Sequence, residues 1–239
     1  MGRRKTLRTN KYPYHVVARS HNKLWFPLPI SEMWPIYLKV IDKVVKDYKV
    51  RVYAFTLMNN HFHLMIDTPM SNIDEVMYWI MKLSTLEVQQ QSGVINSIYG
   101  GRYKSSLLTQ ANYRANAYKY ILQNPVKANM VIKVEAYPYS LSSYFSSDSP
   151  FSIFELVDLF SFDLLKKDDV LDWLNNKFSP DEDKSISQGL LRPEFRYGKD
   201  SRNKTVEPEV IHPRYTKYDQ MWKTLIPSEE KDSNQISLF

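Results

Sequence analysis

The chain has 239 residues, 43% of them hydrophobic, a net charge of +6 and no cysteine. This length suits one domain of ordinary size with an appendage, or two small domains, and the composition excludes disulfides and thiolate metal sites. No run approaches the roughly 18 apolar residues of a membrane span, and the basic N-terminus lacks the apolar segment of a signal peptide, so we expect a cytoplasmic protein.

Positive charge is concentrated in the first part of the chain. Residues 1–150 hold 19 Lys and Arg against 9 Asp and Glu, a net of +10, whereas residues 151–239 hold 13 against 17, a net of −4. Seven basic residues and no acidic one lie within residues 1–23. This imbalance indicates a polyanionic partner, most simply nucleic acid, although a solvated basic surface explains it equally well.

The N-terminal part is predicted to alternate strands and helices. A basic arm, residues 1–11, precedes a short strand at 14–19. Apolar residues at fourfold spacing predict a helix over 31–48, and a β-branched and aromatic run predicts a strand over 50–57. The pair Asn59-Asn60 then suits a turn, so this strand can form a hairpin with the next one.

The next strand, residues 58–67, carries a pair of histidines. Side chains alternate faces along a strand, so His61 and His63 share one face while Phe62 and Leu64 point to the other as core residues. Neutral imidazole is the commonest nitrogen ligand of metals, which makes the pair a candidate site for a divalent ion. On spacing alone, two histidines with ordinary hydrogen bonds on a half-exposed strand are the more common arrangement.

A second helix and a short edge strand follow. Ser71 opens the helix, whose apolar stripe runs from Ile73 to Leu86. The segment 98–108 contains Arg102-Tyr103-Lys104 after two glycines. A guanidinium and an aromatic ring on flexible backbone suit contacts with phosphate and base, although a glycine turn before an edge strand is the simpler interpretation.

The third predicted helix, residues 112–123, ends before Pro125 because the residue that precedes proline is pushed out of the α region. Tyr120 and Asn124 lie one turn apart on one face. A tyrosine aimed at a metal-bound phosphate is a candidate nucleophile, whereas packing in the core is the plainer role. Asn124 followed by proline also suits a helix N-cap.

The order β-α-β-β-α-β-α predicts an α+β fold with a ferredoxin-like antiparallel sheet and helices on one face. The third helix is then free to lie near the histidine strand. A serine-rich stretch after residue 140 indicates a boundary, so we expect one domain over 1–147 and a C-terminal extension over 148–239. The extension is predicted to contain helices at 153–165 and 166–178 and then an extended polar segment.

Four motifs in this order resemble those of one protein family. Met58-Asn59-Asn60-His61-Phe62-His63-Leu64 resembles the HUH motif of single-tyrosine transposases, and the segment from Tyr120 to Ala128 resembles their Tyr-Ile-x-x-Asn-Pro-Val-x-Ala block. Arg102-Tyr103-Lys104 and Tyr137-Pro138-Tyr139-Ser140 also resemble family stretches. Over roughly residues 10–147 the chain is therefore similar to the IS200/IS605-like transposases, and among these to the REP-associated tyrosine transposases.

The resemblance implies a metal-dependent endonuclease and strand transferase that acts on single-stranded DNA with hairpins, such as REP-like or transposon-end sequences. It implies that His61, His63 and Asn124 hold Mg²⁺ or Mn²⁺ and that Tyr120 forms a 5′-phosphotyrosine intermediate. We further expect basic and aromatic residues to contact DNA and the protein to be associated with the nucleoid. The expected contacts are Arg3, Arg4, Lys5, Arg8, Arg19, Arg102, Tyr103 and Lys104.

Two other functions stay open. A domesticated protein that binds DNA hairpins without cleaving them would have no need of two histidines and a tyrosine together. A generic metal hydrolase would need more acidic or histidine ligands near the pair, and only Asp67 is close. The sequence is compatible with a monomer or a homodimer.

Overall fold

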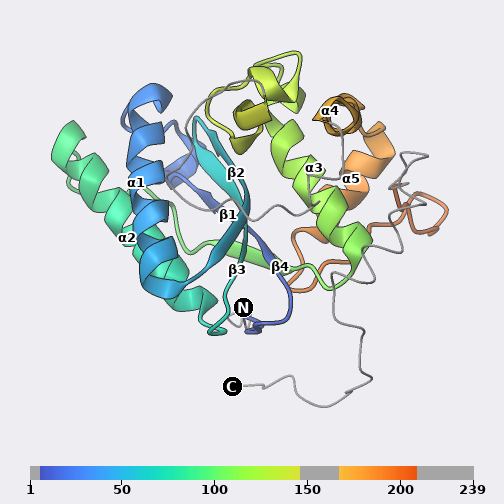
Figure 1. The fold of residues 1–239 in the computed structure, drawn as a ribbon, viewed down its shortest axis with the longest axis horizontal. Helices are drawn as coiled ribbons and strands as arrows, with labels where there is room; N and C mark the ends of the chain where they lie inside the picture. The colour runs from blue at the N-terminus through green and yellow to red at the C-terminus, as the bar shows by residue number, and fades with distance from the viewer. Residues whose placement is uncertain (1–5, 146–166, 209–239) are drawn as a thin grey trace.

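The computed structural model describes residues 6–145 and 167–208 (Figure 1). Arg3, Arg4, Lys5 and the helix expected at 153–165 lie outside the described residues. Within the described part of the chain, no helix has the length and apolarity that crossing a membrane requires.

The centre of the fold is a four-stranded antiparallel sheet. Its strands are β1 (Tyr14–Arg19), β2 (Arg51–Met58), β3 (His61–Asp67) and β4 (Lys104–Leu107), in the order β2-β3-β1-β4. Every pairing is antiparallel, and β2 and β3 form the expected hairpin around Asn59 and Asn60. This is the strand order of a ferredoxin-like sheet, so the predicted fold class is confirmed.

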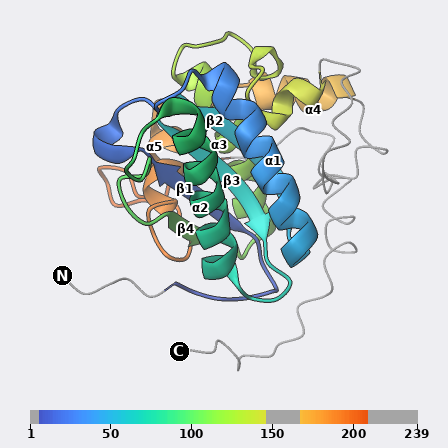
Figure 2. The same ribbon diagram turned by 90° about the vertical axis from the view of Figure 1, so that its left-hand side faces the viewer.

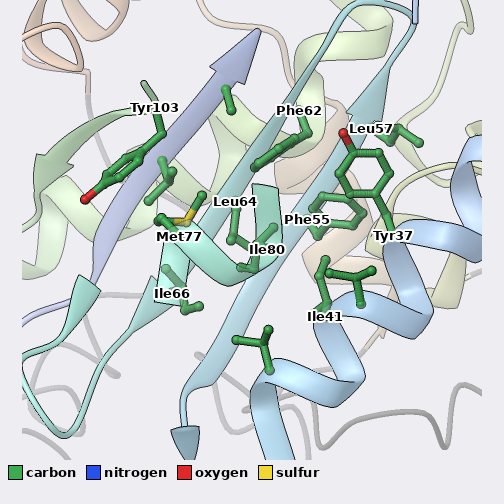
Figure 3. Packing of buried hydrophobic residues seen from close by; sticks show 14 of the residues in the cluster. Tyr37, Ile41, Phe55, Leu57, Phe62, Leu64, Ile66, Met77, Ile80 and Tyr103 are labelled. Atoms are coloured by element: carbon green, nitrogen blue, oxygen red, sulfur yellow. The ribbon is translucent and has the colours of Figure 1, made fainter. Parts of the chain in front are cut away.

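Helices α1 (Ile30–Tyr48) and α2 (Ile73–Ser92) lie side by side over one face of the sheet (Figure 2). The core between them holds alternate residues of the strands, among them Phe62, Leu64 and Ile66 of β3 (Figure 3). Because the strand period is two, these apolar side chains point to α1 and α2, and His61 and His63 are left on the opposite face. Leu86, at the end of the predicted apolar stripe, is instead exposed.

Helix α3 (Ala111–Lys127) lies on the opposite face of the sheet from α1 and α2 (Figure 1). Helices therefore cover both faces, and the prediction of helices on one face holds for α1 and α2 alone. The predicted end before Pro125 is wrong, because α3 continues through this residue to Lys127. Pro125 and Val126 are buried, and their packing outweighs the local preference of the residue before proline.

The described part of the C-terminal extension packs against α3. Helices α4 (Lys167–Asn175) and α5 (Pro180–Gly189) share a buried cluster with α3 and the sheet. Gln123 of α3 donates hydrogen bonds from Nε2 to the carbonyls of Leu174 and Asn176, at 2.6 and 2.9 Å. The extended segment expected after residue 178 in fact begins with α5, whose first turn is closed by a capping box of Ser179 and Glu182.

Three short 3₁₀ helices complete the described structure. They cover His21–Lys23, Val134–Ala136 and Leu141–Phe145. The motif around Ser140 adds a bridge to the sheet at Thr56, where the two hydroxyls lie 2.8 Å apart. This contact holds the chain that leaves α3 against β2.

Candidate active site

Two histidines of β3 face helix α3. The rings of His61 and His63 have centroids 5.0 Å apart and lie nearly perpendicular to each other. In the β1–β3 register, His61 is opposite Arg19 and His63 is opposite Val17, so these four side chains share the α3 face of the sheet. The arrangement predicted from the alternation of β3 is therefore present.

Each of the two rings is held through its Nδ1 atom. His61 Nδ1 lies 2.6 Å from Asn60 Oδ1, and His63 Nδ1 lies 2.8 Å from Nε2 of His15. A histidine that binds a metal usually makes its second hydrogen bond in this way, because the bond fixes the tautomer and the ring orientation. The Nε2 atoms of His61 and His63 are thus the nitrogens available to a ligand.

His15 is part of the site but escapes reasoning from local sequence. It lies on β1 opposite Met65, and its ring stacks on that of His63 with centroids 5.1 Å apart. The alternation of β1 predicts that His15 and Arg19 share one face, but it does not say which strand lies beside that face. The register that brings this face next to His63 joins residues about 50 positions apart, and no motif reports it.

The three imidazoles are neutral at neutral pH. Burial, and then the positive charge of Arg19, lowers the pKa of His61 to about 4. Burial also lowers the pKa of His15 to about 3 and holds that of His63 well below its usual value, with a further contribution from the neighbouring histidines. Only a neutral imidazole has a lone pair for a metal, so the site favours the form that binds one.

Tyr120 reaches the histidines from α3. Its ring meets that of His63 edge-on at a centroid distance of 5.9 Å, and that of His15 at 6.4 Å. Lys127 Nζ lies 4.4 Å from the centroid of the Tyr120 ring and forms an ion pair with Asp183 of α5 at 2.5 Å. The C-terminal extension thus contributes Asp183, which pairs with the lysine beside the Tyr120 ring.

The phenol of Tyr120 is protonated in this environment. Burial, and secondarily the negative charge of Asp183, raises its pKa to about 12, while Arg19 acts in the opposite direction. A phenol with this pKa is a weak nucleophile, so any reaction in which it attacks requires help with the departing proton.

Asn124 lies within α3, one turn after Tyr120, and its Nδ2 donates to the Tyr120 carbonyl at 2.7 Å. Because the helix continues on both sides of it, Asn124 is not a helix N-cap. This hydrogen bond uses the amide nitrogen, and the amide oxygen stays available as a ligand atom. Its role at a metal site is therefore still a prediction.

Asp67 is occupied by structural contacts. Its carboxylate accepts from Tyr53 at 2.7 Å and from Arg51 Nε at 3.1 Å, and it is buried. Across the described ranges, no group of three or more His, Asp and Glu side chains is arranged to hold a metal ion. Asp67 is therefore not free to bind a metal, which weakens the alternative of a metal hydrolase with several acidic ligands.

The expected DNA contacts that lie within the described residues are divided between the two faces of the sheet. Arg8 and Tyr103 bond to Asp74 of α2 at 2.8 and 2.7 Å, and Arg102 pairs with the same carboxylate. These residues border a hollow of about 890 Å³ beside α2. Arg19 and Lys104 are exposed and belong to the α3 face by strand alternation. The expected contacts thus form two separate groups.

Comparison with known proteins points to one family. The family model described as "Transposase IS200 like" matches residues 8–124. A solved structure of a REP-associated tyrosine transposase bound to a REP hairpin is 17% identical with a TM-score of 0.52, covering 66% of this chain and 94% of the other. A proposed transposase from Deinococcus radiodurans is 15% identical with a TM-score of 0.34, covering 51% and 94%. No curated protein matches the chain. At 17% identity, the likeness to the REP-associated transposase structure concerns the fold alone.

Proposed function

We propose that this protein cuts and rejoins single-stranded DNA that carries hairpins, because residues 8–124 match the model of the IS200-like transposase family. The observation that carries the proposal is the meeting of His61, His63 and Tyr120 on one face of the sheet, from β3 and α3. A protein that only binds DNA has no need of this combination. Hairpin DNA is a fitting substrate because the similar REP-associated transposase is bound to a REP hairpin.

We infer that His61 and His63, through their Nε2 atoms, and Asn124, through Oδ1, would hold Mg²⁺ or Mn²⁺. The residues fit such an ion, since both imidazoles are neutral and are oriented through Nδ1. An amide oxygen suits hard cations, and a phosphate oxygen would complete the ligands. When bound, the ion supplies polarisation of the scissile phosphate.

Tyr120 is the proposed nucleophile. Its phenolic oxygen attacks phosphorus and forms a phosphotyrosine ester with the new 5′ end that the break creates. The bond from phosphorus to the 3′ oxygen breaks, and that oxygen leaves as a hydroxyl after it takes up a proton. The reverse reaction, attack of a 3′-hydroxyl on the ester, rejoins a strand and releases the phenol. The number of phosphate ester bonds is conserved, so no external energy source is required.

Incubation of labelled hairpin oligonucleotides with the protein and Mn²⁺ tests the proposal. Cleavage together with a labelled protein band that survives denaturation is expected. Hairpin binding without either product would instead support the domesticated, non-cleaving protein. Because binding to DNA is common to both functions, association with the nucleoid is expected in each case and does not distinguish them. A monomer and a homodimer are both compatible with one tyrosine per chain.

Arg19→Ala is expected to weaken hairpin binding and to reduce the slope of log affinity against log salt by about one. Arg19 is exposed, lies opposite His61 and faces the site, which suits a contact with the phosphate next to the scissile bond. Fluorescence anisotropy over a range of salt concentrations measures the slope. Lys39→Ala on the outer side of α1 removes the same charge and serves as the control. An Arg19→Ala slope equal to that of wild type would remove Arg19 from the DNA path.

Asn124→Ala is expected to raise the Mn²⁺ concentration required for half-maximal cleavage, because the site loses an oxygen ligand. The lost hydrogen bond to the Tyr120 carbonyl accounts for about 1 kcal/mol of stability. Cleavage as a function of Mn²⁺ and the melting temperature are measured on the same preparation. A lower melting temperature with unchanged dependence on Mn²⁺ would leave Asn124 with a structural role only.

A further inference from the structure

His15 and His63 lie together in an enclosed part of the site. The exposed fraction is 2% for His15 and 6% for His63. Their rings stack with an interplanar angle of 24°, and His15 Nε2 lies 2.8 Å from His63 Nδ1. Buried polar groups depend on protein partners for their hydrogen bonds, so this contact sets the rotation of the His63 ring.

We propose that His15 is a positioning residue that holds His63 ready to bind a divalent ion, an inference that rests on the metal-dependent function proposed above. Between two neutral imidazoles, one nitrogen donates and the other accepts. With His15 Nε2 as the acceptor, His63 carries its proton on Nδ1 and presents the lone pair of Nε2 to the site. The reverse arrangement puts the proton of His63 on Nε2, and this nitrogen is then lost as a ligand.

The partner of His63 differs in kind from that of His61. Asn60 Oδ1, which lies next to His61 Nδ1, is an oxygen that only accepts. It therefore commits His61 to one tautomer. An imidazole such as His15 can either donate or accept, so the direction of the His15–His63 bond depends on what the second nitrogen of His15 does.

Ser106 is the neighbour of His15 that we assign to this second nitrogen. It is the residue opposite His15 in the β1–β4 register, and opposed side chains on one face of a sheet lie about 5 Å apart at Cβ. His15 Nδ1 and Ser106 Oγ are both buried, and neither has a hydrogen-bond partner among the described residues. A serine hydroxyl can accept or donate. When it accepts from His15 Nδ1–H, His15 Nε2 is left as the acceptor that His63 requires, and when it donates to Nδ1 the His15–His63 bond runs the other way. We assign Ser106 the accepting role.

Two substitutions separate this role from simple packing. His15→Phe keeps an aromatic ring but has no acceptor, whereas His15→Gln supplies an amide oxygen that accepts from His63 Nδ1–H. We expect His15→Phe to weaken Mn²⁺ binding about 10- to 100-fold, measured by electron paramagnetic resonance without DNA, and His15→Gln to restore most of the affinity. Binding of Mn²⁺ by His15→Phe as tightly as by wild type would overturn the role of His15.

The double variant His61→Ala/His63→Ala serves as the reference for ions bound elsewhere on the protein. Wild-type binding no stronger than that of the double variant would remove the proposed metal site, and the role of His15 with it. Wild-type binding well above this reference, matched by His15→Phe, would remove the role of His15 alone. The two failures are therefore distinguishable.

A second measurement requires no variant at His15. Long-range ¹H–¹⁵N correlation spectra of the imidazoles in the metal-free protein report which ring nitrogen carries the proton. We expect His63 and His15 both to be protonated on Nδ1, with Ser106→Ala reducing the share of this tautomer. A His63 ring protonated mainly on Nε2 in the wild-type protein would overturn the proposal.

Discussion

Tyr120→Phe is expected to abolish the covalent protein–DNA adduct while hairpin affinity changes little. The substitution removes the oxygen that we propose attacks phosphorus, and it keeps the ring that packs against His63 and lies under Lys127. Denaturing electrophoresis with labelled DNA detects the adduct, and fluorescence anisotropy measures binding. The expected loss is complete within detection, because no other atom of Tyr120 can form the ester.

Tyr113→Phe is the matched control for this experiment. Tyr113 also lies on α3, but its ring packs against Phe195 and Tyr197 instead of the histidines. Its Phe variant is expected to form the adduct at the wild-type rate. An adduct formed by Tyr120→Phe, or lost in Tyr113→Phe, would assign the nucleophile to a different tyrosine.

Single His61→Ala and His63→Ala variants are expected to lower Mn²⁺-dependent cleavage by about 100-fold or more, because each removes one of the two proposed nitrogen ligands. Binding of hairpin DNA without metal is expected to persist, since neither imidazole is charged at neutral pH. Cleavage rates at several Mn²⁺ concentrations and calorimetric titration of the ion measure the effect.

His21→Ala is the control variant, because it removes a histidine that lies outside the site. His21 is exposed and lies in the 3₁₀ turn that follows β1. We expect its cleavage rate and ion affinity to match those of wild type. Cleavage at the wild-type rate by His61→Ala or His63→Ala would return these residues to ordinary structural roles on β3.

The parts of the site that depend on local periodicity were predictable from the sequence. Alternation along β3 places His61 and His63 on one face and Phe62 and Leu64 on the other, and the structure has this arrangement. The order of strands and helices likewise leads to the observed sheet, because antiparallel pairing and short connections leave few alternatives.

The features that the sequence did not reveal depend on contacts between distant residues. His15 joins the site only through the β1–β3 register, and α3 passes Pro125 because buried neighbours hold it. Helix α5 carries few apolar residues, so its pattern resembles that of an exposed segment. In each case tertiary packing overrides or supplements a local rule.

The motif Arg102-Tyr103-Lys104 shows the same limit. Three adjacent residues suggest one contact surface, yet Tyr103 belongs to the core beside α2 and Lys104 faces the other side of the sheet. Strand alternation separates them, while Arg8, distant in sequence, joins Arg102 at Asp74. Footprinting of the two groups tests whether one DNA molecule contacts both faces.

Peptide mapping of the covalent adduct tests the central claim most directly. The protein is incubated with a hairpin oligonucleotide and Mn²⁺, the adduct is digested with trypsin and nuclease, and the modified residue is located by mass spectrometry. We expect a nucleotide joined through a 5′ phosphate to the phenolic oxygen of Tyr120, and a free 3′-hydroxyl on the released strand. A 5′ phosphate on any other residue, or cleavage that leaves no covalent adduct, would contradict the account.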